Sequence, residues 1–178
     1  MKRDIGHILI TEEDLQRRVA EMSREISADY ADKDPLFVGV LKGSFIFMGD
    51  LMRNMEGHCT MDFMAVSSYG NQSETTGAVK INKDLSEDIE GRHVIIVEDI
   101  LDSGVTLNYL IQYLQGRQPA SIEIAALLDK PERRKKPVKA KYVGFEIPDV
   151  FVVGYGLDFA ERYRNLPYVG VLKPEVYS

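Results

Sequence analysis

The sequence contains one cysteine, Cys59, and three histidines among its 178 residues. A single cysteine excludes an intrachain disulfide, and neither Cys59 nor the histidines have the spacing of zinc ligands. No stretch approaches the roughly 20 apolar residues of a membrane span, and residues 1–4 are not followed by the apolar core of a signal peptide. From these absences we expect a cytoplasmic protein with no membrane partner and no zinc.

Positive charge is also scarce, because 22 Lys and Arg stand against 28 Asp and Glu and give a formal net charge of −6. Nucleic-acid binding depends largely on basic side chains that neutralise phosphates, so this balance argues against a DNA or RNA partner. The one basic run, residues 133–136, lies between Pro131 and Pro137 without interleaved aromatic residues. Its pattern predicts a solvated connecting loop.

Strand-like and helix-like segments alternate along the chain, and no repeat or linker separates them. Apolar residues make up 44% of the chain and charged residues 28%, which is ordinary for one globular domain. The alternation predicts a single α/β domain over 1–178 with a mostly parallel sheet. Polar residues 67–78 predict a mobile loop. Strands are expected at 36–41, 61–66, 94–97, 122–128, 143–146 and 150–153, and helices after a Thr11 cap, at 45–55 and at about 107–114.

The most informative segment reads VIIVEDILDSGVTL over residues 94–107. A buried strand followed by a helix places residues 102–106 in a strand-to-helix turn, where the free amide groups of a helix N-terminus favour an anion. We therefore expect Ser103, Gly104, Val105 and Thr106 to bind a phosphate.

Two acidic residues, Glu98 and Asp99, precede this turn. Carboxylates repel a phosphate, but they accept hydrogen bonds from vicinal sugar hydroxyls and can hold a hydrated Mg²⁺. One stretch of chain thus offers sites for a phosphate and a ribose. The alternative interpretation is an ordinary βα unit with a solvated acidic loop.

This segment resembles the phosphoribosyl-pyrophosphate motif of type I phosphoribosyltransferases, which consists of two acids, two apolar residues and then D-S-G-x-T. The resemblance implies a twisted, mostly parallel sheet flanked by helices, with a small cap, or hood, over its ligand edge. The core would span about 36–145, and the cap would come from the N-terminus and about 146–178. Asp102 would act as the general base or acid at N7 of a purine.

A second strand-to-helix turn contains Lys42 and Gly43. Lysine supplies charge and glycine allows close backbone approach, so the turn could bind pyrophosphate, although alone it is an ordinary turn. Together with the acidic motif it is similar to the pyrophosphate loop of the family, in which the peptide bond before the lysine is often cis.

The segment from Phe151 to Arg164 resembles the purine-binding segment of hypoxanthine-guanine phosphoribosyltransferases. The resemblance implies that Phe151 stacks on the base and that the Val152 backbone meets the polar edge of the base. It also implies that Asp158 helps to hold magnesium and that Arg164 reaches pyrophosphate. Lys130 matches the lysine that donates to the 6-oxo group. Taken singly, Phe151 suits a core position and Lys130 suits the surface.

Ser68 and Tyr69 resemble the serine-tyrosine pair of the lid that closes over the active site in this family. Closure would keep water from the activated sugar. One departure concerns Val105, where some relatives have a lysine, so the phosphate would depend on backbone amides with Ser103 and Thr106.

The resemblance implies an enzyme of purine salvage that joins phosphoribosyl pyrophosphate to hypoxanthine or guanine, with Mg²⁺ held by Glu98, Asp99 and Asp158. Alternatives are a xanthine-guanine-preferring enzyme and a non-catalytic regulator that senses phosphoribosyl pyrophosphate. Relatives commonly form homodimers or homotetramers. The sequence does not decide among the purines, between dimer and tetramer, the kinetic order, or the conformation of the Leu41–Lys42 peptide.

Overall fold

The computed structural model describes residues 1–68 and 79–178. Its main sheet contains β2 (Leu36–Leu41), β3 (Thr60–Ser68), β4 (Val79–Lys83), β5 (His93–Leu101), β6 (Ser121–Asp129) and β7 (Tyr142–Glu146). Within the described residues the order is β4-β3-β2-β5-β6-β7, and each neighbouring pair is parallel except β3 with β4. The predicted α/β class is confirmed.

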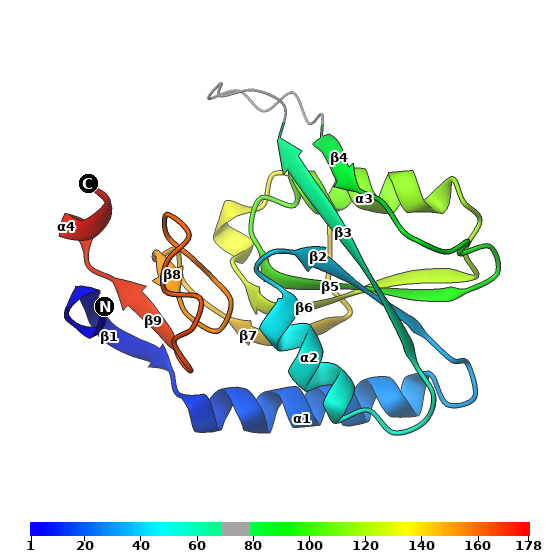
Figure 1. The fold of residues 1–178 in the computed structure, drawn as a ribbon, viewed down its shortest axis with the longest axis horizontal. Helices are drawn as coiled ribbons and strands as arrows, with labels where there is room; N and C mark the ends of the chain where they lie inside the picture. Colours follow the sequence, from blue (N-terminus) through cyan, green and yellow to red (C-terminus); the bar gives the residue numbers. More distant parts are fainter. Residues whose placement is uncertain (69–78) are drawn as a thin grey trace.

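Helices cover both faces of this sheet (Figure 1). The helices α1 (Glu12–Asp29) and α2 (Phe45–Arg53) pack on one face, and α3 (Val105–Gln115) packs on the other. In β2 and β5, Phe37 and Ile95 belong to the cluster under α1 and α2, whereas Val38 and Ile96 belong to the cluster under α3. Burial on both faces explains why these strands read as continuous apolar runs.

The first long helix begins as its sequence predicts. The Thr11 side chain accepts a hydrogen bond from the Asp14 amide at 3.2 Å, which satisfies one of the free donors at the helix start. Its apolar stripe is fully buried against the sheet, as the spacing predicted; the residues are Leu15, Val19, Met22 and Ile26.

A second, antiparallel sheet has the order β1-β9-β8, with β1 (Ile5–Ile10), β8 (Val152–Val153) and β9 (Val169–Leu172). The short helices η1 (Lys2–Asp4) and α4 (Pro174–Tyr177) flank it. Both chain ends therefore lie in this small cap beside the main sheet (Figure 1). The N-terminal segment is divided between the cap and the core, because β1 belongs to the cap sheet and α1 packs on the main sheet. The domain limits near 36 and 145 stay a prediction.

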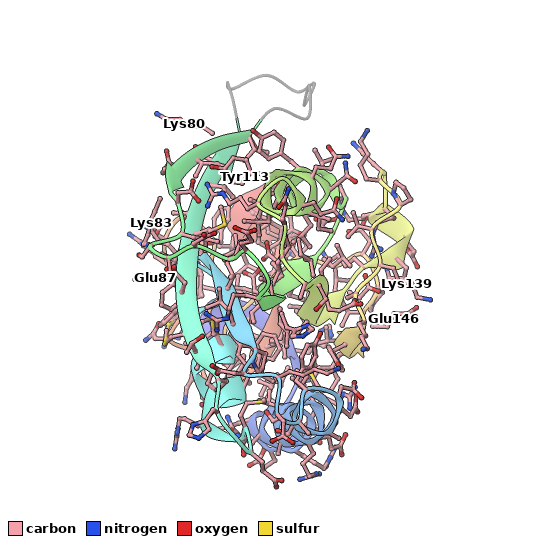
Figure 2. All side chains as sticks on the ribbon, turned by 90° about the vertical axis from the view of Figure 1, so that its right-hand side faces the viewer. Lys80, Lys83, Glu87, Tyr113, Lys139 and Glu146 are labelled. Atoms are coloured by element: carbon pink, nitrogen blue, oxygen red, sulfur yellow. The ribbon has the colours of Figure 1, made fainter. Side chains whose placement is uncertain are left out.

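The edge of the main sheet differs from expectation at β4, which the sequence did not predict. Val79 is buried, whereas Lys80 and Lys83 are exposed on this edge strand (Figure 2). A short, lysine-bearing edge strand carries little apolar periodicity, and its charges oppose pairing with other chains. In the described residues no helix has the length and apolar character to span a membrane.

Candidate active site

The turns after β2 and β5 lie side by side because these strands are parallel neighbours, with Gly39 opposite Val97. Gly43 packs directly against Asp99, and a Cβ at position 43 would overlap the Asp99 carboxylate. The Leu41–Lys42 peptide bond is cis. The structure thus brings the predicted pyrophosphate turn into contact with the predicted acidic pair.

The strand β5 is longer than the sequence predicted and continues through both acids to Leu101. Glu98 is buried, and burial, with the nearby charge of Asp99, raises the pKa of Glu98 well above its usual range. Burial also raises the pKa of Asp99, partly offset by a hydrogen bond from Glu98. Two adjacent desolvated carboxyl groups are costly when both are ionised, so the pair is suited to a cation or to hydrogen-bond donors.

The acidic pair has few neighbouring ligands for a metal. Within residues 1–68 and 79–178, no group of three or more His, Cys, Asp or Glu is arranged to hold a metal ion. Mg²⁺ commonly keeps several waters and is held by one or two carboxylates plus substrate phosphates. Glu98 and Asp99 therefore fit Mg²⁺ as a partly hydrated ion that shares its ligands with a substrate.

The predicted phosphate turn encloses a cavity of about 160 Å³ at the start of α3. Gly104 caps the helix with φ of 79°, a left-handed conformation that favours glycine. The Val105 amide donates to the Ser103 hydroxyl at 3.3 Å, and the Val105 side chain is not part of the lining. The lining residues are Glu98, Ile100, Leu101, Asp102, Ser103, Gly104, Thr106 and Leu107.

Asp102 has a side-chain partner that the sequence did not predict. Arg133 Nε lies 2.6 Å from Asp102 Oδ1, and Arg133 Nη1 lies 3.5 Å from Asp149 Oδ2. Arg134 donates to the Asp102 carbonyl oxygen at 3.1 Å and also binds Asp129. The prediction of a solvated loop at 133–136 holds for Arg133, whose side chain is 49% exposed, and is wrong for Arg134, which is 20% exposed and is held by Asp129. No periodicity or motif could have revealed the contacts of these arginines with Asp102, which lies 31 and 32 residues away.

Residues predicted to bind the purine come from β6 and the cap. Lys130 follows β6 and is buried, with Nζ 3.7 Å from Asp149 Oδ1. Phe151, just before β8, is partly exposed and stacks on Tyr177 with ring centroids 4.7 Å apart. Val152 is buried in β8. Asp149 therefore links Lys130 to the segment that carries Phe151, which brings the two predicted base contacts into one region.

The predicted pyrophosphate residues meet where the cap reaches the turn after β2. Arg164 Nη2 lies 3.4 Å from Asp158 Oδ1 and 3.2 Å from Glu161 Oε1, and Lys42 Nζ lies 3.0 Å from Glu161 Oε2. Arg164 Nε is buried without a hydrogen-bond partner among the described residues. A buried donor without an acceptor is unfavourable, so an anionic ligand would be well placed to satisfy it. Glu161 was not predicted, because its role depends on a contact across 119 residues.

The predicted lid begins at the end of β3. Ser68 is the last residue of this strand and is exposed. Tyr69 lies outside the described residues, so the role of the pair in a lid stays a prediction.

Comparison with known proteins identifies the class. Residues 10–160 match the family model for the phosphoribosyl transferase domain. The chain therefore belongs to the phosphoribosyltransferases.

Individual relatives narrow this assignment. The hypoxanthine-guanine phosphoribosyltransferase of Bacillus subtilis (strain 168) is 56% identical over 178 residues, covering 100% of this chain and 99% of the relative. A crystal structure of a hypoxanthine phosphoribosyltransferase from Staphylococcus aureus superposes with a TM-score of 0.98 at 53% identity, over 100% of this chain and 97% of that chain. A hypoxanthine-guanine phosphoribosyltransferase from Bacillus anthracis has a TM-score of 0.92 at 49% identity, over 95% of this chain and 99% of that chain. Within its class, the chain belongs to the hypoxanthine-guanine phosphoribosyltransferase family.

Proposed function

We propose that the protein transfers the 5-phosphoribosyl group from phosphoribosyl pyrophosphate to hypoxanthine or guanine, releasing pyrophosphate. The observation that carries this proposal is the contact of Gly43 with Asp99 beside the cavity at the start of α3. A phosphate turn, an acidic pair and a basic turn are adjacent, in the order that a sugar carrying phosphate and pyrophosphate requires.

The donor is held at three points. Amide groups at the start of α3, with Ser103 and Thr106, bind its 5′-phosphate. Glu98 and Asp99 accept hydrogen bonds from the ribose hydroxyls. Lys42, the Gly43 backbone and Arg164 bind its pyrophosphate.

The purine is oriented by the residues between β6 and the cap. Phe151 stacks on the ring, and the backbone of Val152 meets its polar edge. Lys130 donates to the 6-oxo group, which favours 6-oxopurines because adenine would leave the buried ammonium without an acceptor.

In the reaction, N9 of the purine forms a bond to the anomeric carbon while the bond from that carbon to pyrophosphate breaks. Asp102 accepts the proton from N7 and returns it in the reverse direction. Lys42 and Arg164 stabilise the negative charge that grows on pyrophosphate. Exclusion of water protects the activated sugar from hydrolysis.

We propose Mg²⁺ as the metal, held by Glu98 and Asp99 on the ribose side and by Asp158 on the pyrophosphate side. When bound, the ion neutralises phosphate charge and orients the donor. Asp158 fits such a role because it lies beside Arg164 at the predicted pyrophosphate site.

The test is an assay of nucleotide formation from phosphoribosyl pyrophosphate, Mg²⁺ and one of four purines: hypoxanthine, guanine, xanthine or adenine. Turnover of hypoxanthine or guanine with little turnover of adenine is expected. A preference for xanthine would indicate the xanthine-guanine alternative, and binding of the donor without any turnover would indicate a regulator.

We also propose that the protein is cytoplasmic, acts on small molecules without binding nucleic acid, and forms a homodimer or homotetramer. Light scattering should give a mass of two or four times the chain mass of 20.1 kDa. A mass of one chain would contradict the oligomer.

A further inference from the structure

Glu161 joins two cations that come from distant parts of the chain. Its Oε2 lies 3.0 Å from Lys42 Nζ, and its Oε1 lies 3.2 Å from Arg164 Nη2. Each carboxylate oxygen therefore takes one cation. Arg164 donates to the Glu161 carboxylate through Nη2, and its Nη1 donates to the Gly156 carbonyl oxygen at 2.8 Å.

The local backbone directs Glu161 toward these cations. Ala160 and Glu161 have φ of 51° and 63°, in the left-handed region that non-glycine residues seldom adopt. The Glu161 amide donates to Asp158 Oδ2 at 2.9 Å, and Phe159 bridges to Arg162 in a tight reversal. A strained turn that is fixed in this way holds the carboxylate over the cation pair.

We propose that Glu161 is an internal anion that occupies the Lys42–Arg164 cation pair in the free enzyme and competes with the pyrophosphate group of the donor and the product. The inference rests on the proposed function, because that function assigns Lys42 and Arg164 to pyrophosphate. It adds a residue that lowers affinity for this group instead of raising it.

The exposure of the pair makes the displacement feasible. The side chains of Lys42 and Glu161 are 67% and 64% exposed, so their attraction is weakened by water and salt. Pyrophosphate carries more negative charge than one carboxylate and can also accept from the buried Arg164 Nε. The ligand therefore displaces Glu161, but at the cost of the ion pairs that Glu161 made.

This competition has a consequence for product release. Without Glu161, Lys42 would have no carboxylate partner in the described residues, and Arg164 would keep only its longer contact with Asp158 at 3.4 Å, so the two cations would retain pyrophosphate more strongly. Glu161 supplies that partner when pyrophosphate leaves. The residue therefore limits the affinity for donor and product together.

The test compares the wild-type protein with Glu161→Gln, which keeps the size of the side chain and removes its charge. Binding of inorganic pyrophosphate is measured by isothermal titration calorimetry, once without metal and once with Mg²⁺. We expect the variant to bind pyrophosphate about threefold to tenfold more tightly in both conditions, because two weak ion pairs no longer compete. Product inhibition by pyrophosphate should strengthen by a similar factor.

Glu90→Gln is the matched control, because Glu90 is an exposed residue of the turn before β5 and its substitution removes the same charge. It should leave pyrophosphate affinity unchanged. Equal or weaker binding by Glu161→Gln, in either condition, overturns the inference.

Lys42→Gln separates this inference from the proposed function. The proposed pyrophosphate site is supported if the wild-type protein binds pyrophosphate, if the donor competes with pyrophosphate, and if Lys42→Gln weakens pyrophosphate binding. In that case the Glu161→Gln variant alone decides the inference. If the donor and pyrophosphate do not compete in the wild-type protein, the proposed function fails first.

Discussion

Asp102 lies between the end of β5 and the start of α3, where one carboxylate oxygen is bound by Arg133 at 2.6 Å. Its second oxygen is the candidate acceptor for the purine N7 proton. Asp102→Asn should lower kcat by about 10²–10⁴-fold, because the amide cannot accept that proton as a general base. The KM for phosphoribosyl pyrophosphate should stay near the wild-type value. Steady-state kinetics checks both, and an unchanged kcat would remove the acid-base role.

Arg133 is predicted to position Asp102. Arg133→Gln should lower kcat/KM for hypoxanthine about threefold to fivefold, because an exposed ion pair of this kind contributes modestly. Arg133→Lys should recover part of the loss, and the KM for phosphoribosyl pyrophosphate should not change.

Lys136→Gln is the control for Arg133, because Lys136 lies in the same loop, is exposed and loses the same charge. It should behave as wild type with both substrates. An equal loss in the Arg133 and Lys136 variants would show that general charge, and not the contact with Asp102, causes the effect.

At the scale of elements, periodicity predicted α1, β2 and β6 well because burial imposes it on their side chains. The limits of β5 were less predictable, since Glu98 and Asp99 are acids within a strand. Local propensity disfavours acids there, but the main-chain pairing of β5 with β6 continues to Leu101.

In the candidate site, too, local features could be predicted from the sequence and contacts between distant segments could not. Glycine and hydroxyl-rich turns could be read from the sequence because their backbone requirements are local, as at Gly104. Contacts between distant segments, such as Arg133 with Asp102 and Glu161 with Lys42, depend on the packed fold. A single sequence contains no periodic signal for them.

The strand β4 is tied to α3 by a polar cluster. Tyr113 of α3 and Arg117, which follows the end of that helix, both bind the carboxylate of Asp84, which follows β4. Arg117 Nη2 lies 2.7 Å from the Tyr113 hydroxyl. Tyr113→Phe should lower the free energy of unfolding by about 0.5–1.5 kcal/mol, because it removes the hydroxyl from this cluster. Urea denaturation measures the change.

Tyr109→Phe is the comparison for Tyr113. Tyr109 stacks on Tyr113, but its hydroxyl has no hydrogen-bond partner among the described residues. This variant should lose less stability than Tyr113→Phe. An equal loss would indicate that ring packing, and not the bond to Asp84, fixes β4 on the helix.

At the scale of the whole molecule, the acidic pair lowers stability at neutral pH. Burial raises the folded-state pKa of Glu98 above its unfolded value, so the folded state binds a proton more strongly. The stability that this proton contributes is present below the unfolded pKa and is lost as pH rises through the folded pKa.

Glu98→Gln should therefore raise the melting temperature at pH 8 and have little effect near pH 4. At pH 8 the melting temperature should rise by about 2–4 °C for each kcal/mol by which the substitution increases the free energy of unfolding. Calorimetry at both pH values measures it, with Glu90→Gln as the exposed control. A lower melting temperature at pH 8 would contradict the account of Glu98 as a functional acid kept at a cost in stability.

The most direct test of the central claim is a crystal structure of the protein with phosphoribosyl pyrophosphate and Mg²⁺. The account predicts the 5′-phosphate at residues 103–106, the ribose beside Glu98 and Asp99, and the pyrophosphate against Lys42 and Gly43. A donor bound away from the junction of β5, α3 and the turn after β2 would contradict it.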